Sequence, residues 1–189
     1  MEVYVVDNGG QWTHREWRVL RDLGVESKIV PNLTAVKDLQ VDGLVLSGGA
    51  PRVGIDPSKM GRNGEYLDEI GCPILGICAG HQFMALHFGG ETKPARVPEF
   101  GKTEVLIEEP GDLFKGLPKR FTVWESHNDE VTVAPKGFKR LASSDNCPVQ
   151  AMQAVDRPLY GVQFHPEVEH TQHGSDIFKN FLDVCRRER

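Results

Sequence analysis

The first half of the chain alternates short apolar runs with amphipathic stretches. The apolar runs are four to six residues long and rich in Val, Ile and Leu, which is typical of buried strands. The stretches between them repeat apolar residues at helical spacing, as Trp12, Val19, Leu20 and Leu23 do. Strands that alternate with helices favour a parallel sheet covered by helices on both faces. In chain order we predict strand Glu2–Val6, helix Gln11–Leu23, strand Val25–Val30, helix Thr34–Gln40 with Thr34 as its N-cap, strand Gly43–Leu46, helix Glu65–Ile70 and strand Pro73–Ile77.

The second half changes to short strand-like runs separated by Pro and Gly, which favours antiparallel hairpins. No linker divides the two halves, so we expect one α/β domain over residues 1–189. Its three layers would hold a mostly parallel central sheet, helices on both faces and a smaller antiparallel region. The predicted strands are Thr103–Glu108, Phe121–Trp124, Glu130–Val133, Lys139–Ala142, Val149–Val155 and Leu159–Phe164, followed by a helix over Gly174–Arg187 with Ile177, Phe178, Phe181, Leu182 and Cys185 facing inward.

Cys78 lies where a predicted strand meets a predicted helix, with Gly76 and Gly80 two residues to each side. This is the layout of a nucleophile elbow with Cys in place of Ser. The glycines avoid side-chain clashes in a strained turn, and the helix N-terminus favours a thiolate. A free Cys is more often a small buried hydrophobe, and we assign that role to Cys72, Cys147 and Cys185. Cys78 as a nucleophile requires a base from elsewhere in the chain.

Three loops follow predicted parallel strands and should meet at one edge of the sheet, where such folds bind their ligands. These loops are Asp7–Gln11, Ser47–Pro51 and Cys78–Gln82.

His165 ends the last predicted strand and is the candidate base. Glu167 lies two residues on, and residues i and i+2 of an extended stretch point the same way. Glu167 can therefore orient the imidazole and stabilise it when protonated, which gives a Cys-His-Glu triad. A rival interpretation is a metal site built from His165, His170 and His173. Their spacing matches no helical zinc signature and leaves Cys78 unexplained, so we predict no metal.

Composition narrows the possible partners and setting. The formal net charge of −5 leaves no basic surplus for neutralising phosphates, which argues against nucleic acid as the main partner. No apolar stretch is long enough to span a bilayer, and the start of the chain lacks a basic, apolar signal segment. The four cysteines form no CxxC pair. We therefore expect a reducing, cytoplasmic setting.

The stretches Gly76–Gln82 and His165–Glu167 together resemble a class I glutamine amidotransferase, a family that hydrolyses the side-chain amide of glutamine and passes on the ammonia. The resemblance runs nearly end to end and implies that family's flavodoxin-like fold. Asp7–Gln11, Leu46–Gly49, Trp124–Asp129 and Gly161–Val168 narrow it to the amidotransferase subunits of two-subunit, archaeal-type GMP synthases.

The resemblance implies roles for individual residues. Ala79 departs from the family, which usually has a larger residue there, and Ala50 stands where Pro usually follows the glycines. The implied roles are Cys78 as nucleophile, His165 as base, Glu167 as its orienter, Gly49 and Ala79 as backbone oxyanion donors, Gln82, Phe100, Gly101, Ser126 and His127 as glutamine-binding residues beside Glu99, and Asp129 as a partner-facing residue.

The resemblance also implies that this chain holds no cofactor. Neither GxGxxG nor GxxxxGK[ST] occurs in it, so ATP, Mg²⁺ and XMP are expected on a separate ATP-pyrophosphatase subunit of GMP synthase. Three alternatives remain open at this point. They are an amidotransferase subunit of another synthetase, a stand-alone γ-glutamyl hydrolase and a non-enzymatic glutamine-sensing module.

Overall fold

One sheet of nine strands runs through the computed structural model, which describes residues 1–188. Its order is β2-β1-β3-β4-β9-β8-β7-β5-β6. The strands from β2 to β9 pair in parallel, and those from β9 to β6 pair antiparallel. The strands are β1 Val3–Asn8, β2 Ile29–Pro31, β3 Gly43–Gly49, β4 Ile74–Ile77, β5 Glu91–Ile107, β6 Arg120–Val133, β7 Phe138–Ser143, β8 Ala151–Ala154 and β9 Leu159–Val162; the helices are α1 Thr13–Asp22, α2 Asn63–Glu69, α3 Ala79–His87 and α4 Gly174–Arg187, with 3₁₀ turns η1 Val36–Asp38 and η2 Pro57–Met60.

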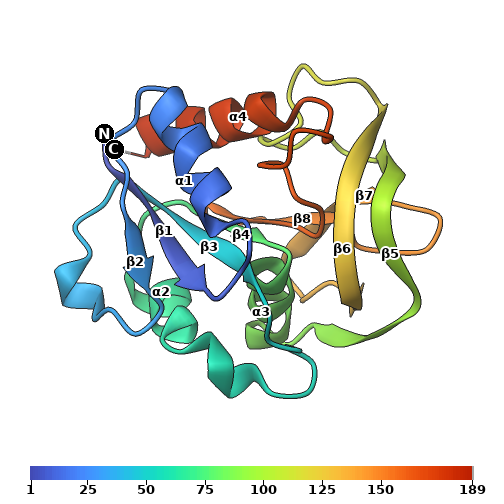
Figure 1. Ribbon diagram of the computed structural model, residues 1–189, viewed down its shortest axis with the longest axis horizontal. Helices are drawn as coiled ribbons and strands as arrows, with labels where there is room; N and C mark the ends of the chain where they lie inside the picture. Colours follow the sequence, from blue (N-terminus) through green and yellow to red (C-terminus); the bar gives the residue numbers. More distant parts are fainter. Residues whose placement is uncertain (189) are drawn as a thin grey trace.

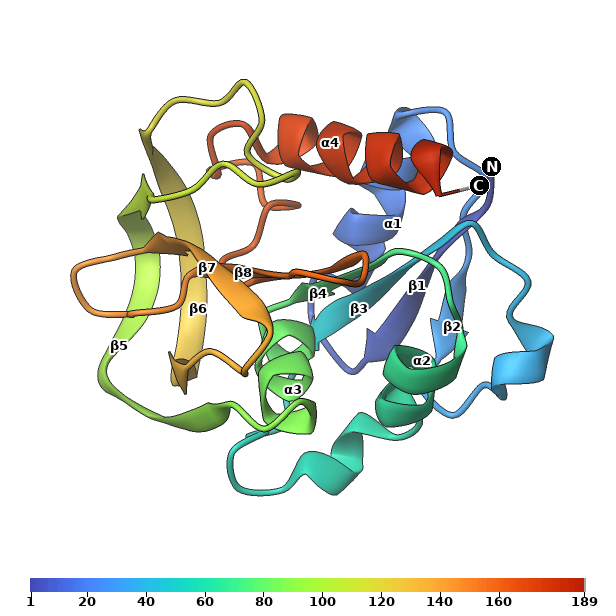
Figure 2. The same ribbon diagram turned by 180° about the vertical axis from the view of Figure 1, so that it is seen from behind.

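Helices cover both faces of the parallel half, as Figures 1 and 2 show: α1 and α4 lie on one face, α2 and α3 on the other. Alternation along the strands divides the core accordingly. Val3 and Val5 of β1 pack in the cluster that holds the α4 side chains, whereas Tyr4 and Val6 pack with Tyr66 of α2. The predicted fold class, a mostly parallel sheet with an antiparallel extension, is therefore confirmed.

Helix α4 has the predicted bounds, and all five of its predicted inward residues are buried. Other elements differ from the prediction. Thr34 does not cap a helix: its Oγ1 donates to the carbonyl of Pro31, and only the 3₁₀ turn η1 follows. The strand predicted over Val25–Val30 is reduced to β2 and a single bridge between Glu2 and Glu26.

The largest difference is the hairpin of β5 and β6. Strand β5 has 17 residues and begins at Glu91, well before the predicted start at Thr103. The two strands predicted over 121–124 and 130–133 are one strand of 14 residues. Polar residues, Pro94 and Pro98 interrupt the apolar alternation that would mark these strands in the sequence. The pairing register of β5 with β6 also shifts between Pro94 and Glu99. Long-range pairing holds this region extended where local sequence does not demand it.

Close backbone contacts fix α3 against the sheet. A Cβ on Gly80 would overlap the carbonyl oxygen of Leu46 in β3, and a Cβ on Gly76 would lie 2.7 Å from the carbonyl carbon of Gly80. Only glycine allows this approach. The strand before Cys78 and the helix after it are thus pressed together. None of the helices in residues 1–188 is both long and apolar enough to cross a membrane.

Gly80→Ala should therefore destabilise the fold by about 2–3 kcal/mol, because the added methyl group must push α3 away from a backbone atom. Urea unfolding would measure the change. Gly64 is the matched control, since it also stands second in its helix, α2, and a Cβ there would meet only side-chain atoms, those of His87 at 3.2 Å and of Phe83 at 3.9 Å. Gly64→Ala should change stability by no more than about 1 kcal/mol, in either direction. Equal effects of the two substitutions would refute the proposed contact.

Candidate active site

Cys78 forms a sharp turn between β4 and α3, as the elbow pattern predicts. Its φ of 49° is one of two positive values among the non-glycine residues described. Such a backbone conformation is strained for a side chain and is commonly found at functional sites. Cys78 occupies the N-cap position of α3, so its sulfur lies at the positive end of the helix dipole.

The three loops that were expected to converge do so around this cysteine. They line a cavity of about 230 Å³ together with α1 and β6. The lining includes Gly9–Gln11 from the first loop, Gly48–Ala50 from the second and Cys78 from the third, with His165 and Ser126 completing it. The parallel sheet thus brings the predicted nucleophile, the predicted base and glycine-rich backbone to one cavity at the carboxyl ends of its strands.

His165 and Glu167 are paired. The Nδ1 atom of His165 lies 2.6 Å from Oε1 of Glu167, and both residues are buried. The backbone N–H of His165 donates to the carbonyl of Trp124 at 3.0 Å, which anchors the loop to β6. Burial by itself would lower the pKa of His165. The charge of Glu167 and a hydrogen bond with Cys78 outweigh burial, and the pKa is raised well above its usual value.

Of the two predicted oxyanion donors, Gly49 lines the same cavity, whereas Ala79 directly follows the cavity-lining Cys78 in the chain. Ala79 opens α3, so its N–H has no acceptor within the helix. Gly49 ends β3, and a Cβ there would lie 2.5 Å from the carbonyl oxygen of Asn8. The side chain of Ala79 packs with buried Val53 and Met60, so these two residues fill the space beside its small methyl group.

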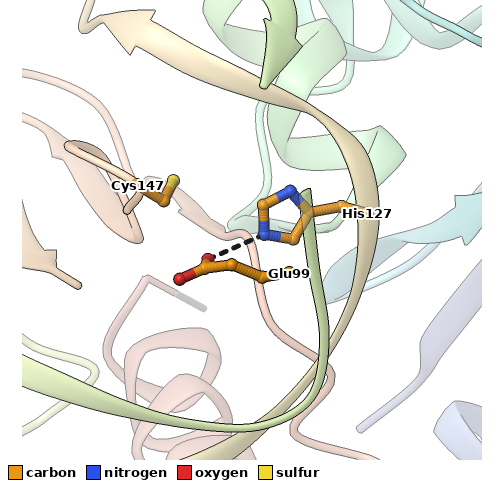
Figure 3. Close-up of side chains that lie close together, drawn as sticks. All are labelled: Glu99, His127 and Cys147. Carbon is orange, nitrogen blue, oxygen red and sulfur yellow. Dashed lines mark hydrogen bonds and ion pairs between the residues drawn. The ribbon is translucent and has the colours of Figure 1, made fainter. Parts of the chain in front are cut away.

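The predicted glutamine-binding residues do not all reach this cavity. Among residues 1–188, Ser126 lines it, whereas Gln82, Phe100, Gly101 and His127 are absent from its wall. Phe100 is 61% exposed. Gln82 is buried and donates to the Asp129 carbonyl at 2.6 Å. The Nε2 atom of His127 lies 3.0 Å from Oε2 of Glu99 (Figure 3).

Asp129 was expected to face a partner, yet it is only 3% exposed. Arg52 binds its carboxylate in two places, with distances of 2.6 Å from Nε and 2.5 Å from Nη2. The side chain of Arg52 is 45% exposed, whereas that of Asp129 is 3% exposed, so Arg52 shields the acid from solvent. A partner at this face would therefore meet Arg52 before Asp129.

The rival histidine metal site is not assembled. His170 packs against the ring of Trp124, and Nδ1 of His173 lies 3.4 Å from Asp176. His165 is already paired with Glu167. In the described part of the chain, the donor group close enough to hold an ion consists instead of Glu99, His127 and Cys147.

The sequence reasoning gave no role to Gln163 and Glu16. Gln163 donates to Sγ of Cys78 at 3.6 Å and accepts from Gln82 at 3.1 Å. It lies two residues before His165, and this spacing along an extended segment could have identified it. Glu16 stands four residues from Trp12 and from Leu20, in the middle of the apolar stripe of α1. A charged residue in such a stripe is the signal that was overlooked.

Glu16 is fully buried beside the cavity. Its Oε1 accepts the Gly48 N–H at 3.3 Å, and its Oε2 has no hydrogen-bond partner among residues 1–188. Burial raises the pKa of Glu16 well above the usual value, and the charge of Glu167 adds to the rise. A second carboxyl group thus lies near the His165–Glu167 pair and accepts a hydrogen bond from the backbone of Gly48.

Comparisons with known proteins agree with this site. The family model described as "Glutamine amidotransferase class-I" matches residues 4–185. The chain is 55% identical to the glutamine-hydrolysing GMP synthase subunit of Thermoplasma acidophilum, covering 100% of this chain and 95% of that protein. It is 48% identical to the protein of the same name from Thermococcus kodakarensis, with coverages of 97% and 98%.

Solved structures give the same result. The crystal structure of a candidate GMP synthase subunit from Thermoplasma acidophilum superposes with a TM-score of 0.95 at 55% identity, covering 99% of this chain and 94% of that one. A glutamine amidotransferase from Thermotoga maritima shares the fold, with a TM-score of 0.75 at 19% identity and coverages of 100% and 83%. The chain therefore belongs to the class I glutamine amidotransferase family, among the glutamine-hydrolysing subunits of GMP synthase.

Proposed function

We propose that this chain is the glutamine-hydrolysing subunit of a two-subunit GMP synthase. It releases ammonia from glutamine for a separate ATP-pyrophosphatase subunit that aminates XMP. The observation that carries the proposal is the cavity that Cys78 and His165 both line, with the ring of His165 paired to Glu167. ATP and Mg²⁺ belong to the partner in this proposal. The four free cysteines fit the predicted cytoplasmic setting.

The first half-reaction begins when the thiolate of Cys78 attacks the side-chain amide carbon of glutamine. The carbonyl oxygen becomes an oxyanion, which the N–H groups of Gly49 and Ala79 stabilise; one such donor contributes roughly 3–4 kcal/mol. The imidazolium of His165 gives its proton to the departing nitrogen, and ammonia leaves. Glu167 supports this step because its charge stabilises the protonated ring.

The second half-reaction releases glutamate. His165, now neutral, takes a proton from a water molecule that attacks the γ-glutamyl thioester. The tetrahedral intermediate uses the same oxyanion donors, and its collapse breaks the carbon–sulfur bond and returns the thiolate of Cys78. Gln163 donates toward that sulfur from the buried side, so it supports the negative charge on the thiolate in both halves.

A stand-alone γ-glutamyl hydrolase would use the same nucleophile and base, but the names of the relatives favour the synthase. The Thermoplasma and Thermococcus proteins are each called a subunit of such an enzyme. Ammonia that escaped into water would be protonated and would no longer be a nucleophile. We therefore expect turnover to be low until the partner subunit provides a shielded route.

A diazo-ketone analogue of glutamine should label Cys78 and no other cysteine. Mass spectrometry of the digested protein would locate the adduct. Cys78→Ala should abolish labelling, whereas Cys72→Ala, which removes a partly exposed thiol outside the cavity, should leave it intact. Labelling that persists in Cys78→Ala, or fails in the wild type with and without the partner, would rule out the proposed nucleophile.

Ammonia release should rise by at least about tenfold when the ATP-pyrophosphatase subunit is added together with ATP and XMP. An assay coupled to glutamate dehydrogenase measures the ammonia released. The partner subunit without this chain is the control. Glutaminase turnover of equal rate without the partner would contradict the coupling and favour the stand-alone hydrolase.

The buried carboxyl group of Glu16 predicts a pH-dependent stability difference. Because the native state raises the pKa of Glu16, it binds this proton more tightly than the unfolded chain does. The stabilisation is fully present below the ordinary value of about 4.5 and is lost as pH rises toward the native pKa. Glu16→Gln cannot ionise, so its stability relative to the wild type should increase as the pH rises above about 4.5.

Urea unfolding at a series of pH values measures this difference. Glu26→Gln, at an exposed position, is the control and should follow the wild type at every pH. Parallel wild-type and Glu16→Gln curves would show that burial of Glu16 does not perturb its ionisation.

A further inference from the structure

Glu16 is an acidic residue on the buried face of α1, and it lies at the wall of the catalytic cavity. Helix α1 packs against β1 and β3 (Figure 1), and Glu16 stands in its first turn. The side chain is 0% exposed and lines the cavity together with Gly48 and His165. Neither half-reaction uses this carboxyl group, so its place in the cavity wall calls for a physical explanation.

The carboxyl group of Glu16 holds the backbone that leads to the predicted oxyanion donor. Its Oε1 accepts the N–H of Gly48 at 3.3 Å. The hydroxyl of Ser47 donates to the carbonyl of Gly48 at 2.8 Å and accepts the N–H of Asn8 at 3.0 Å. Because a peptide group is planar, a bound carbonyl also fixes the direction of the N–H on the next residue, Gly49. Glu16 and Ser47 therefore hold the two peptide groups on either side of Gly48.

Gly48 lies directly against the catalytic pair. A Cβ added to it would lie 3.0 Å from Cε1 of His165 and 3.6 Å from Cβ of Cys78. The ring of Trp12, just before α1, meets the His165 ring edge-on, with 4.5 Å between the centroids. The start of α1 and the glycine backbone thus enclose the base together. A misplacement of about 1 Å within an active site can cost about a hundredfold in rate, so small shifts of this backbone matter.

Stability alone does not explain a carboxyl group at this position. Oε2 of Glu16 has no hydrogen-bond partner among residues 1–188. Burial is the main cause that raises the pKa of Glu16; the charges of Glu167 and Cys78 add to the rise, and that of His165 opposes it. The neutral acid is therefore favoured, and it offers Gly48 one carbonyl oxygen, as a glutamine amide would. A leucine would fill the space without burying a polar group, so what the acid adds is the hydrogen bond to the loop.

We propose that Glu16 is a positioning residue for glutamine hydrolysis, which by accepting the N–H of Gly48 keeps the oxyanion donor of Gly49 directed at the tetrahedral intermediate. The inference rests on the function proposed above. An oxyanion forms in both half-reactions, and Glu16 acts on the donor that stabilises it. Steps that form an oxyanion should therefore depend on Glu16, whereas reactions of the Cys78 thiolate that form none should not.

Steady-state glutaminase assays with the partner subunit, ATP and XMP test this role. Glu16→Leu removes the acceptor and should lower kcat at least about tenfold, with KM changed by less than about threefold. Glu16→Gln keeps a carbonyl oxygen at the same reach and should recover most of that loss. Leu20→Met, one turn along the same buried face, is the matched control and should retain the wild-type kcat.

Two probes that react with Cys78 separate the loop from the nucleophile. Iodoacetamide alkylates a thiolate without forming an oxyanion, so the alkylation rate of Cys78 in Glu16→Leu should stay within about twofold of the wild-type rate. Glutamate γ-semialdehyde accepts the sulfur at its aldehyde carbon and becomes a tetrahedral adduct. Its inhibition constant should rise by the same factor as kcat falls. Urea unfolding checks that the variants are folded, and Glu16→Asp, whose carboxyl group is one methylene shorter, should show the same loss if Glu16→Leu does not fold.

Three results would overturn this role. They are a wild-type kcat in folded Glu16→Leu, an alkylation rate that falls as much as kcat, and a loss in Glu16→Gln as large as in Glu16→Leu. Failure of the wild type itself to hydrolyse glutamine with its partner would refute the proposed function, and this inference with it. The wild-type assay therefore distinguishes the two conclusions.

Discussion

The contact between Gly80 and the carbonyl of Leu46 is the constraint on which the site depends. It brings the first turn of α3 against β3, which no residue with a Cβ could allow. Because α3 begins immediately after Cys78, the contact holds this cysteine in its positive-φ turn. Strain of that kind costs about 1–3 kcal/mol and persists only where packing enforces it. The buried side chains of α3, such as Met84, provide that packing in the adjacent core.

Strand order explains why nucleophile and base meet. In the sheet, β4 lies between β3 and β9. Cys78 follows β4, Gly48 and Gly49 are the last two residues of β3, and His165 lies three residues beyond the end of β9. All three strands are parallel, so their carboxyl ends share one edge. The antiparallel half contributes differently: β6 binds the backbone of His165 through Trp124 and presents Ser126 to the cavity.

Sequence reasoning succeeded where a local pattern and a local structure coincide. The elbow, α4 and the convergence of the loops each follow from short-range signals such as paired glycines, helical spacing and strand ends. It failed for the β5–β6 hairpin because pairing between residues about 30 positions apart, such as Glu99 with His127, determines that structure. The same hairpin carries four of the residues predicted to bind glutamine, and their directions could not be deduced without its register.

That register gives β6 two distinct faces. Its side chains alternate, so Trp124 and Ser126 face the catalytic side while Glu125 and His127 face the side on which Glu99 is buried. The carbonyl of Ser126 lies 4.0 Å from the sulfur of Cys78. The backbone that borders the nucleophile is therefore held from its reverse face by the buried pair of His127 and Glu99, whose Nε2 and Oε2 atoms lie 3.0 Å apart. Contacts on both faces of β6 thus fix this part of the cavity wall.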